Sequence, residues 1–393
     1  MDIFRKCYEF TRAEEVIEKG IYPYFRPISE VKGNKVIVNG REMIMVGSNN
    51  YLGLAGDPRI HEAMKEAIDI YGSGTCGSRF LNGTLQMYLD LEAQLAEFMQ
   101  KESALVFSTG YQTNLGIISA LVGKNDVILM DRVDHASLID ATRLSFGKVF
   151  KFKHNDMEDL ERLLQSLPEE TGKLIVVDGV YSMDGDLADL PVMVRLEEKY
   201  GARLVVDDAH GIGVLGEHGR GTVEHFGVNE GVDLVMCTFS KSFASLGGFV
   251  AGDRKVVDCI KHFGRPVIFS ASITPAAAAA AMKALEIIKS EPERRQRLME
   301  IAHRMKSECT KMGYDTARSE TPIVPLVIKD EEKTFELWLA LREMGVFCTP
   351  VIPPAVNPEN SMIRTSYTAT HTDEELTQVL EAFRQAGKSV GIF

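Results

Sequence analysis

The stretch from residue 174 to residue 211, LIVVDGVYSMDGDLADLPVMVRLEEKYGARLVVDDAHG, contains the pattern that decides the fold. It holds two short apolar runs, Leu174–Val177 and Leu204–Val206, in which apolar residues follow one another without polar ones between them. Such runs are typical of strands buried on both faces of a parallel sheet. Between them, Pro191–Tyr200 has a helical pattern that Gly201 ends. The stretch therefore predicts a strand–helix–strand unit of an open α/β fold.

The same alternation extends outward on both sides of this unit. A further helical pattern covers Met157–Ser166, with Asp156 as its N-cap. More apolar runs of similar length predict strands at Ala104–Phe107, Val127–Met130, Lys148–Lys153, Leu234–Cys237 and Phe249–Ala251. Together these patterns predict a large α/β domain built on a mostly parallel, seven-stranded sheet.

The chain changes character after Ala271. Thr274 and Pro275, followed by six alanines, predict a capped helix with proline at its first position, and the helical pattern continues to Lys311. Beyond it we expect strands at Ile323–Ile328 and Val346–Val351 and helices at Thr334–Met344 and Thr372–Gly387. These patterns predict an N-terminal segment (residues 1–50) that packs with the small domain, a large domain (51–289) and a small α+β domain (290–393).

The composition of the 393 residues excludes several classes of protein. The chain is 45% hydrophobic and 25% charged, which is typical of a globular enzyme and not of a disordered or collagen-like chain. The net charge of −12, without a long basic run, argues against a nucleic-acid partner. Six scattered cysteines without a Cys-x-x-Cys pair predict neither a disulfide framework nor a zinc site. No apolar run reaches the ~18 residues of a membrane helix, and acidic residues interrupt the first twenty, so we expect a cytoplasmic protein with no integral membrane segment.

Polar side chains follow five of the predicted strands directly. These segments are Ser108–Tyr111, Asp131–His135, Asp178–Asp186, Asp207–Gly211 and Thr238–Ser242. In open α/β sheets ligands bind beyond the carboxyl ends of the strands. A helix start offers backbone N–H groups to a phosphate, and burial among hydroxyls and glycines would lower the pKa of Lys241 and suit it to form a Schiff base. Each segment alone has a plain structural explanation, but together they predict one composite site.

Two interpretations from other classes stay open at this point. Asp207, Asp208, His210 and His135 are ligand types that a metal-dependent hydrolase also uses, although that interpretation leaves Lys241 unexplained. A binding module without catalytic activity is the other. The visible absorption of the purified protein separates both from an enzyme that uses Lys241 to form a Schiff base. Such an enzyme is yellow when it holds an aldehyde covalently, whereas a metal-dependent hydrolase is colourless.

These strand-end residues resemble those of the fold type I pyridoxal-phosphate enzymes and, among them, the α-oxoamine synthases. The resemblance covers roughly Gly20 to Phe393. Its most specific motif is Thr238-Phe239-Ser240-Lys241-Ser242 with Gly247-Gly248, followed by Asp207-Asp208-Ala209-His210 and Gly219-Arg220-Gly221. The resemblance implies a fold type I transferase, pyridoxal 5'-phosphate (PLP) as cofactor, no metal, and a homodimer with shared active sites.

The resemblance also implies a role for individual residues. Lys241 would hold the cofactor covalently, and Asp207 would pair with the ring nitrogen and keep it protonated. His135 would stack on the ring, and His210 and Ser182 would lie near the 3-hydroxyl. The residues expected at the phosphate are Ser108, Gly110, Tyr111, Thr238, Ser240 and, reaching the neighbouring subunit, Ser272.

For the substrates, the resemblance implies an amino acid and an acyl-CoA. Arg364 would grip the amino-acid carboxylate in a bidentate manner, helped by either Asn49 or Asn50. Arg79 belongs to Ser78–Thr84, a segment similar to that of soluble bacterial members that condense L-serine with palmitoyl-CoA, and we expect it to bind substrate.

Two further segments, Tyr22–Arg26 and Ala386–Ile392, resemble the same group. They favour a decarboxylating Claisen condensation of L-serine with palmitoyl-CoA to 3-ketodihydrosphingosine, CoA and CO2, the first step of sphingolipid synthesis. Asp208 is more typical of 8-amino-7-oxononanoate synthase, which uses L-alanine and a pimeloyl thioester. That activity therefore stays open, as do 2-amino-3-ketobutyrate CoA ligase activity and condensation of another amino acid such as cysteate.

Overall fold

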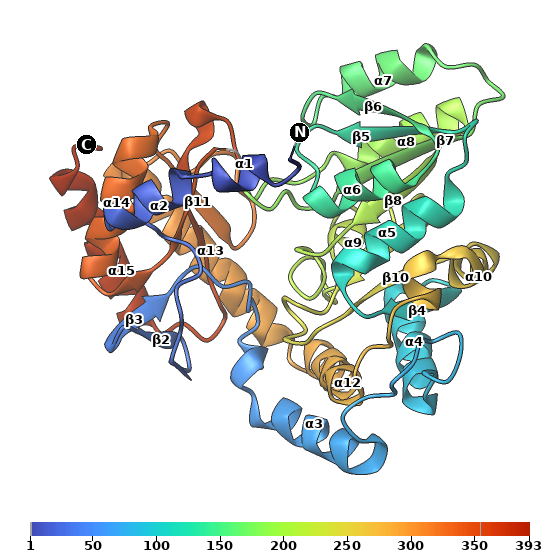
Figure 1. Ribbon diagram of the computed structural model, residues 1–393, viewed down its shortest axis with the longest axis horizontal. Helices are drawn as coiled ribbons and strands as arrows, with labels where there is room; N and C mark the ends of the chain where they lie inside the picture. The colour runs from blue at the N-terminus through green and yellow to red at the C-terminus, as the bar shows by residue number, and fades with distance from the viewer. Residues whose placement is uncertain (1, 354) are drawn as a thin grey trace. The chain divides into compact units, whose positions relative to one another are not determined.

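The computed structural model describes residues 2–353 and 355–393, which form two compact units (Figure 1). The larger unit comprises residues 49–301 and 318–322, and the smaller unit comprises residues 2–48, 302–317 and the described part of 323–393. The sequence placed one boundary at residue 290. The two compact units divide at Ile301, inside the helix α13 (Pro292–Met312), and the domain boundary at residue 290 stays a prediction.

The larger unit is built on a seven-stranded sheet with the order β4-β10-β9-β8-β7-β5-β6. Its strands are β4 (Ser103–Phe107), β5 (Val127–Asp131), β6 (Lys148–Phe152), β7 (Lys173–Asp178), β8 (Arg203–Asp207), β9 (Leu234–Thr238) and β10 (Gly248–Gly252). Only β10 runs against its neighbours in this sheet. The predicted mostly parallel sheet is confirmed, and each predicted run lies on one of these strands.

Both faces of this sheet are buried along its inner strands, which explains their continuous apolar runs, whereas the edge strand β6 is mostly exposed. Alternate residues, such as Leu105 and Phe107 of β4, form one core cluster with Ile117 and Ile118 of α5 (Gly110–Leu121). The residues between them, such as Val106, are equally buried. In Figure 1, α5 and α6 (Ala136–Leu144) lie side by side. The other helices of this unit are α3 (Pro58–Tyr71), α4 (Gln86–Met99), α7 (Met157–Gln165), α8 (Leu190–Tyr200), α9 (Thr222–His225), α10 (Arg254–Phe263), α11 (Arg265–Ile268) and α12 (Pro275–Ser290), with a 3-10 turn, η1, at Leu54–Gly56.

The predicted helix ends have the expected chemistry. The Asp156 side chain accepts a hydrogen bond from the Asp159 amide at the start of α7. Gly201 ends α8 in the left-handed conformation, at φ 60°. Thr274 caps α12, whose first residue is Pro275. Local sequence therefore fixes where these helices begin and end.

The prediction of one helix from Thr274 to Lys311 is wrong. α12 ends at Ser290, and a separate helix, α13 (Pro292–Met312), follows after Glu291. Pro292 lacks an N–H and restricts Glu291 to extended conformations, so the α12 hydrogen-bond ladder stops before it.

The smaller unit holds two small sheets. One has the order β1-β2-β3-β12 and the other the order β11-β14-β13. Their strands are β1 (Glu30–Lys32), β2 (Lys35–Val38), β3 (Arg41–Met45), β11 (Ile323–Val327), β12 (Val346–Phe347), β13 (Thr349–Val351) and β14 (Met362–Ser366). Its helices are α1 (Arg5–Tyr8), α2 (Arg12–Glu18), α14 (Glu331–Glu343) and α15 (Asp373–Ser389), with a 3-10 turn, η2, at Pro358–Asn360.

The prediction of a single strand at Val346–Val351 is also wrong. β12 pairs in parallel with β3, whereas β13 pairs antiparallel with β14, so the run supplies two sheets and changes partner at Cys348. An apolar run indicates burial but does not specify which strand it pairs with. Among the described residues, no helix is long and apolar enough to cross a membrane.

Candidate active site

The carboxyl ends of the parallel strands meet around a cavity of about 260 Å³. Because β4, β5, β7, β8 and β9 run in the same direction, the segments that follow them share this edge of the sheet. The lining residues are Thr109, Gly110, Tyr111, His135, Ser137, Asp178, Val180, Ser182, Asp207, Ala209, His210, Met236, Thr238, Ser240, Lys241, Leu246 and Gly247. The structure thus brings together Lys241, Asp207, His135, His210 and Ser182, as the composite-site prediction requires.

Asn114 of α5 holds two of these residues at once. Its Nδ2 donates to Asp207 Oδ2 at 2.7 Å and to Ser137 Oγ at 2.8 Å. Asp207 Oδ1 also accepts from the Ala209 amide at 3.0 Å. Both carboxyl oxygens of Asp207 therefore have donors from the protein, which fixes the side chain at the wall of the cavity.

The hydrogen bond with Ser137 determines which ring nitrogen of His135 carries the proton. Because Ser137 Oγ accepts from Asn114, its proton is directed to His135 Nδ1, 2.7 Å away, and the Ser137 amide also donates to this nitrogen. Nδ1 is therefore an acceptor, and the neutral ring carries its proton on Nε2. Burial lowers the pKa of His135, and this outweighs the opposing effect of Asp207. His135 thus presents an uncharged, flat ring to the cavity.

Asp178 adds a second carboxyl group beside Asp207. The two residues are paired in register at the ends of β7 and β8. Burial, and then repulsion from Asp207, raises the pKa of Asp178 well above its usual range. Asp178 Oδ2 accepts from the His135 amide at 3.0 Å.

One end of the cavity is the N-terminus of α5. Thr109 caps this helix by accepting from the Gln112 amide at 3.1 Å. A Cβ at Gly110 would lie 2.6 Å from Thr238 Oγ1, so this approach of helix to strand requires glycine. Thr238 Oγ1 lies 2.9 Å from Ser240 Oγ. Helix N–H groups and two hydroxyls together form a cradle suited to a phosphate.

His210 is oriented from the segment that precedes η1. The Tyr51 hydroxyl lies 2.7 Å from His210 Nδ1, and Tyr51 is only 1% exposed. This hydroxyl also donates to Asn49 Oδ1 at 3.3 Å, whereas Asn50 Oδ1 accepts from the Ala55 amide and closes a turn. Asn49 thus contacts the Tyr51–His210 pair.

Six predicted residues do not line the cavity, namely Ser108, Ser272, Arg79, Asn49, Asn50 and Arg364. Ser108 Oγ donates to the Ala271 carbonyl, and Ser272 Oγ donates to the Gly83 carbonyl at 2.7 Å. Arg79 forms a paired, buried contact with Glu92, at 2.7 and 3.1 Å. Its guanidinium group is thus held inside the protein, so its assignment to substrate binding gains no support from this geometry.

Arg364 belongs to the smaller unit. It lies in the middle of β14 and is paired in register with Pro325 and Thr349. The residue is 8% exposed. Its role toward substrate stays a prediction.

The side chains proposed for a metal-dependent hydrolase do not form a metal-binding group. Within the described residues, the group close enough to share an ion is His154, Asp184 and Asp186. Asp208 is fully buried; its Oδ2 accepts from the Thr222 amide at 2.7 Å, and burial raises its pKa to about 7. Asp208 thus faces away from the cavity that Asp207 lines.

Sequence reasoning missed Asn114, Ser137 and Tyr51. Ser137 follows His135 by two residues at a helix start, a spacing typical of a capping contact. Asn114 lies four residues after Gly110, and therefore on the same face of α5 as the residue that enters the cradle. These two spacings were the available signals; no local pattern pairs Tyr51 with His210.

A family model described as aminotransferase class I and II matches residues 41–383. The chain belongs to this family. Serine palmitoyltransferase of Sphingobacterium spiritivorum is 51% identical, with 96% of each chain covered. 8-Amino-7-oxononanoate synthase of Symbiobacterium thermophilum is 44% identical over 95% of this chain and 96% of the relative. This member of the family is thus an α-oxoamine synthase, as its motifs predict.

Solved structures agree with this family membership. Sphingomonas wittichii serine palmitoyltransferase is 38% identical, with a TM-score of 0.97 and both chains covered completely. A serine palmitoyltransferase from S. paucimobilis with bound PLP–myriocin aldimine is 35% identical, also with a TM-score of 0.97 and complete coverage. The enzymes of this fold type use PLP.

The residues of the cavity fit PLP. The phosphate requires the anion cradle at Gly110 and Thr238, the ring nitrogen requires a fixed carboxyl group such as Asp207, and the aldehyde requires an amine such as Lys241. All of them line one cavity, with the flat ring of His135 beside them. The predicted cofactor is therefore consistent with the geometry as well as with the family.

Proposed function

We propose that this family member condenses L-serine with palmitoyl-CoA, with loss of CO2, to give 3-ketodihydrosphingosine and CoA. The observation that carries the proposal is the cavity shared by Lys241, Asp207 and His135, in a chain that matches serine palmitoyltransferases over almost its whole length. In this reaction a carbon–carbon bond forms at the thioester carbonyl, the carbon–sulfur bond breaks to release CoA, and the bond to the serine carboxylate breaks to release CO2.

PLP, when bound, supplies an electron sink that stabilises negative charge at the amino-acid Cα. Lys241 would hold it covalently and, once displaced by serine, would take the Cα proton as a base. Asp207 would keep the ring nitrogen protonated, since Asn114 and the Ala209 amide fix its carboxyl group in place. These residues carry the proton movements of the reaction.

The other lining residues orient the reacting groups. The neutral ring of His135 would stack on the cofactor, and His210 and Ser182 would lie at its 3-hydroxyl. The N-terminus of α5 at Gly110 and Tyr111, with Thr238 and Ser240, would hold the phosphate. The Tyr111 hydroxyl also donates a hydrogen bond to Asp140 Oδ2, which restricts the Tyr111 side chain beside the cradle.

We assign substrate recognition to Arg364 and one of the two asparagines. The Arg364 guanidinium group would form a bidentate pair with the serine carboxylate, helped by Asn49 or Asn50. Arg79 would act on the substrate only by holding its loop, because Glu92 occupies its guanidinium group.

We further propose a cytoplasmic homodimer with active sites shared between subunits. Ser272 would contact the phosphate of the neighbouring subunit, and its hydroxyl would then have to leave the Gly83 carbonyl. Light scattering coupled to size-exclusion chromatography should give twice the mass of the 43.6 kDa chain. A single-chain mass at micromolar concentration would contradict the shared-site arrangement.

A matrix of amino acids against acyl-CoA thioesters, measured as CoA release, tests the activity. L-Serine with palmitoyl-CoA should give the highest rate. Pimeloyl-CoA should be a poor substrate, because its terminal carboxylate would be buried without a partner in a channel that accepts a palmitoyl chain. Faster turnover of L-alanine with pimeloyl-CoA would instead assign 8-amino-7-oxononanoate synthase activity.

A further inference from the structure

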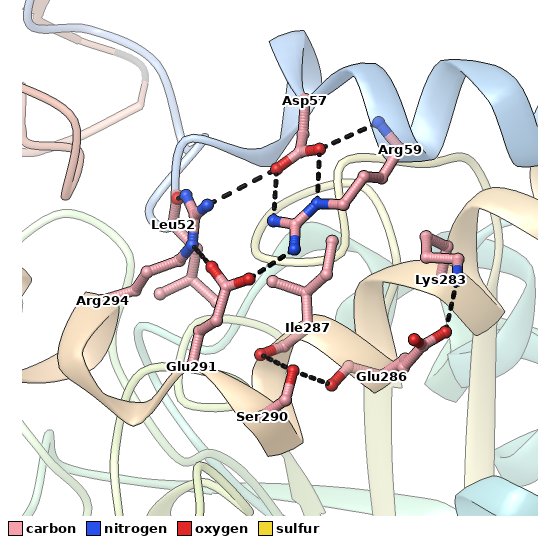
Figure 2. A network of polar contacts seen from close by, with 9 residues as sticks. All are labelled: Leu52, Asp57, Arg59, Lys283, Glu286, Ile287, Ser290, Glu291 and Arg294. Atoms are coloured by element: carbon pink, nitrogen blue, oxygen red, sulfur yellow. Dashed lines mark hydrogen bonds and ion pairs between the residues drawn. The ribbon is translucent and has the colours of Figure 1, made fainter.

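Four charged side chains close a ring between the start of α3 and the junction of α12 with α13 (Figure 2). We call Asp57, Arg59, Glu291 and Arg294 the charge ring. Arg59 donates to both oxygens of Asp57, at 3.0 and 2.8 Å, and to Glu291 Oε1 at 2.5 Å. Arg294 donates to Glu291 Oε2 at 2.6 Å and to Asp57 Oδ2 at 3.4 Å. Each charge therefore lies between two opposite charges.

Three of the four side chains of the charge ring are largely buried, whereas Arg59 is 47% exposed. The side chain of Asp57 is 8% exposed, and those of Glu291 and Arg294 are 21% and 22% exposed. Hydrogen bonds from Arg59 lower the pKa of Asp57, and the same arginine lowers that of Glu291. Both acids are thus charged at neutral pH, and the ring is neutral as a whole.

Arg294 also forms a hydrogen bond outside the charge ring, to the backbone of a segment that contacts His210 of the cavity. It donates to the Leu52 carbonyl at 3.0 Å, a contact drawn in Figure 2. Leu52 follows Tyr51, whose hydroxyl lies 2.7 Å from His210 Nδ1. The turn is compact: the Tyr51 amide donates to the Asn49 carbonyl at 2.8 Å, and Leu52 is fully buried. A shift of the Leu52 carbonyl would therefore move Tyr51 as well.

We propose that Arg294 is a positioning residue for the cofactor pocket. It anchors the Leu52 carbonyl, which holds the Tyr51 hydroxyl against His210, and the charge ring keeps Arg294 in the orientation that this bond requires. The inference rests on the proposed function only through the place of His210 beside PLP. It adds a residue outside the cavity, on a different element, to the set that determines cofactor affinity.

Titration of the apoprotein with PLP alone tests the proposal, with the absorbance of the bound cofactor as the signal. Arg294→Ala and Tyr51→Phe should each raise the PLP dissociation constant about tenfold, because each loosens the contact between Tyr51 and His210. The double variant should also show about a tenfold rise, since both changes break the same path. Lys283→Ala is the control: it breaks the ion pair with Glu286 on α12 and should leave the constant unchanged.

A purely structural role of Arg294 would give a different result. It would lower thermal stability while leaving PLP affinity within twofold of the wild type, or the double variant would lose affinity about a hundredfold as two independent effects. Either result, or an equal loss in Lys283→Ala, overturns the proposal. Should Arg294→Ala not fold, Arg294→Lys replaces it under the same criteria, because lysine cannot reach Leu52, Glu291 and Asp57 together.

This titration separates two kinds of failure. It contains neither amino acid nor acyl-CoA, so an error in the proposed substrates would not change its outcome. A wild-type protein that binds no PLP would contradict the cofactor assignment itself.

Discussion

The seven-stranded sheet of the larger unit and the three-stranded sheet of the smaller unit present functional side chains in different ways. In the first, five parallel strands end at one edge, and each continues into residues that line the cavity. In the second, β14 runs antiparallel to β11 and β13, so the carboxyl ends of neighbouring strands lie at opposite edges of the sheet. Arg364 lies in the middle of β14. The difference predicts a division of labour: substitutions at the shared edge change the chemistry, and a substitution of Arg364 changes substrate affinity.

The largest effect is expected at Lys241. Lys241→Ala should abolish turnover and the covalent link to PLP, because no other amine of the lining residues replaces it. Borohydride reduction of the wild-type holoenzyme, followed by peptide mapping, should label Lys241. Lys173 is an internal control, since it is buried but lies at the start of β7, at the opposite edge of the sheet. Label on Lys173, or on any lysine other than Lys241, would contradict the assignment of the covalent PLP link to Lys241.

Asp207→Asn comes next. The amide keeps the shape but removes the charge that protonates the ring nitrogen, so exchange of the serine Cα proton should fall by about three orders of magnitude while PLP still binds. Proton exchange followed by NMR measures this directly. Asp253→Asn is the matched control, because Asp253 follows the antiparallel strand β10 and caps α10 away from the shared edge. Exchange at a near-normal rate in Asp207→Asn would show that another group protonates the ring.

The contrast between the two sheets also explains how much could be predicted from sequence. Strands buried on both faces form continuous apolar runs, so the inner strands of the large sheet, and the polar residues that follow five of its strands, could be found. The edge strand β6 was also predicted, although it is mostly exposed and its run contains two lysines, Lys148 and Lys151. In the smaller unit, β14 was not predicted, although Arg364 within it was, and one apolar run divides between β12 and β13. Pairing of short strands depends on partners that are distant in sequence.

Contacts within the site also depend on partners that are distant in sequence, so they could not be predicted from local patterns. Asp207 follows a strand directly and could be found, but Asn114, which holds it, lies inside a helix ninety-three residues earlier in the chain. Arg79 has the residue type and family motif of a substrate ligand. Its pairing with Glu92, thirteen residues later in α4, could not be inferred from that motif. Residue type predicts what a side chain can bind, whereas the fold decides which partner reaches it.

Arg364→Ala should affect affinity rather than chemistry. Loss of a bidentate, charge-assisted pair should raise the apparent KM for L-serine by about 10- to 100-fold, while the KM for palmitoyl-CoA and the rate at saturating serine change little. Steady-state kinetics with each substrate varied in turn measures both. Arg384→Ala, which breaks an exposed ion pair with Glu381 on α15, is the control. A loss confined to kcat in Arg364→Ala would place this arginine among the residues that act on the chemistry.

The smallest effect concerns how the shared edge is held together. His154 lies 3.2 Å from Asp131 at the end of β5 and 3.0 Å from Asp186 in the loop that carries Ser182. Burial alone would lower the pKa of His154, but its hydrogen bonds to the two aspartates raise it to about 10. The folded-state pKa therefore exceeds the value of about 6.5 expected in the unfolded chain.

This shift gives a stability profile with a definite sign. The contribution of His154 is fully present below about pH 6.5 and is lost as the pH rises through about 10, since the charged form is favoured in the folded state. His154→Gln should lower Tm by roughly 2–4 °C at pH 6, allowing for the partial exposure of the side chain, and by almost nothing near pH 11. His262→Gln is the control for the loss of a histidine, because the hydrogen bond of His262 Nδ1 goes to the Asp258 backbone carbonyl of α10. An equal loss of Tm in His154→Gln at both pH values would contradict this profile. It would mean that packing, rather than charge, holds the Ser182 loop against the edge of the sheet that carries the site.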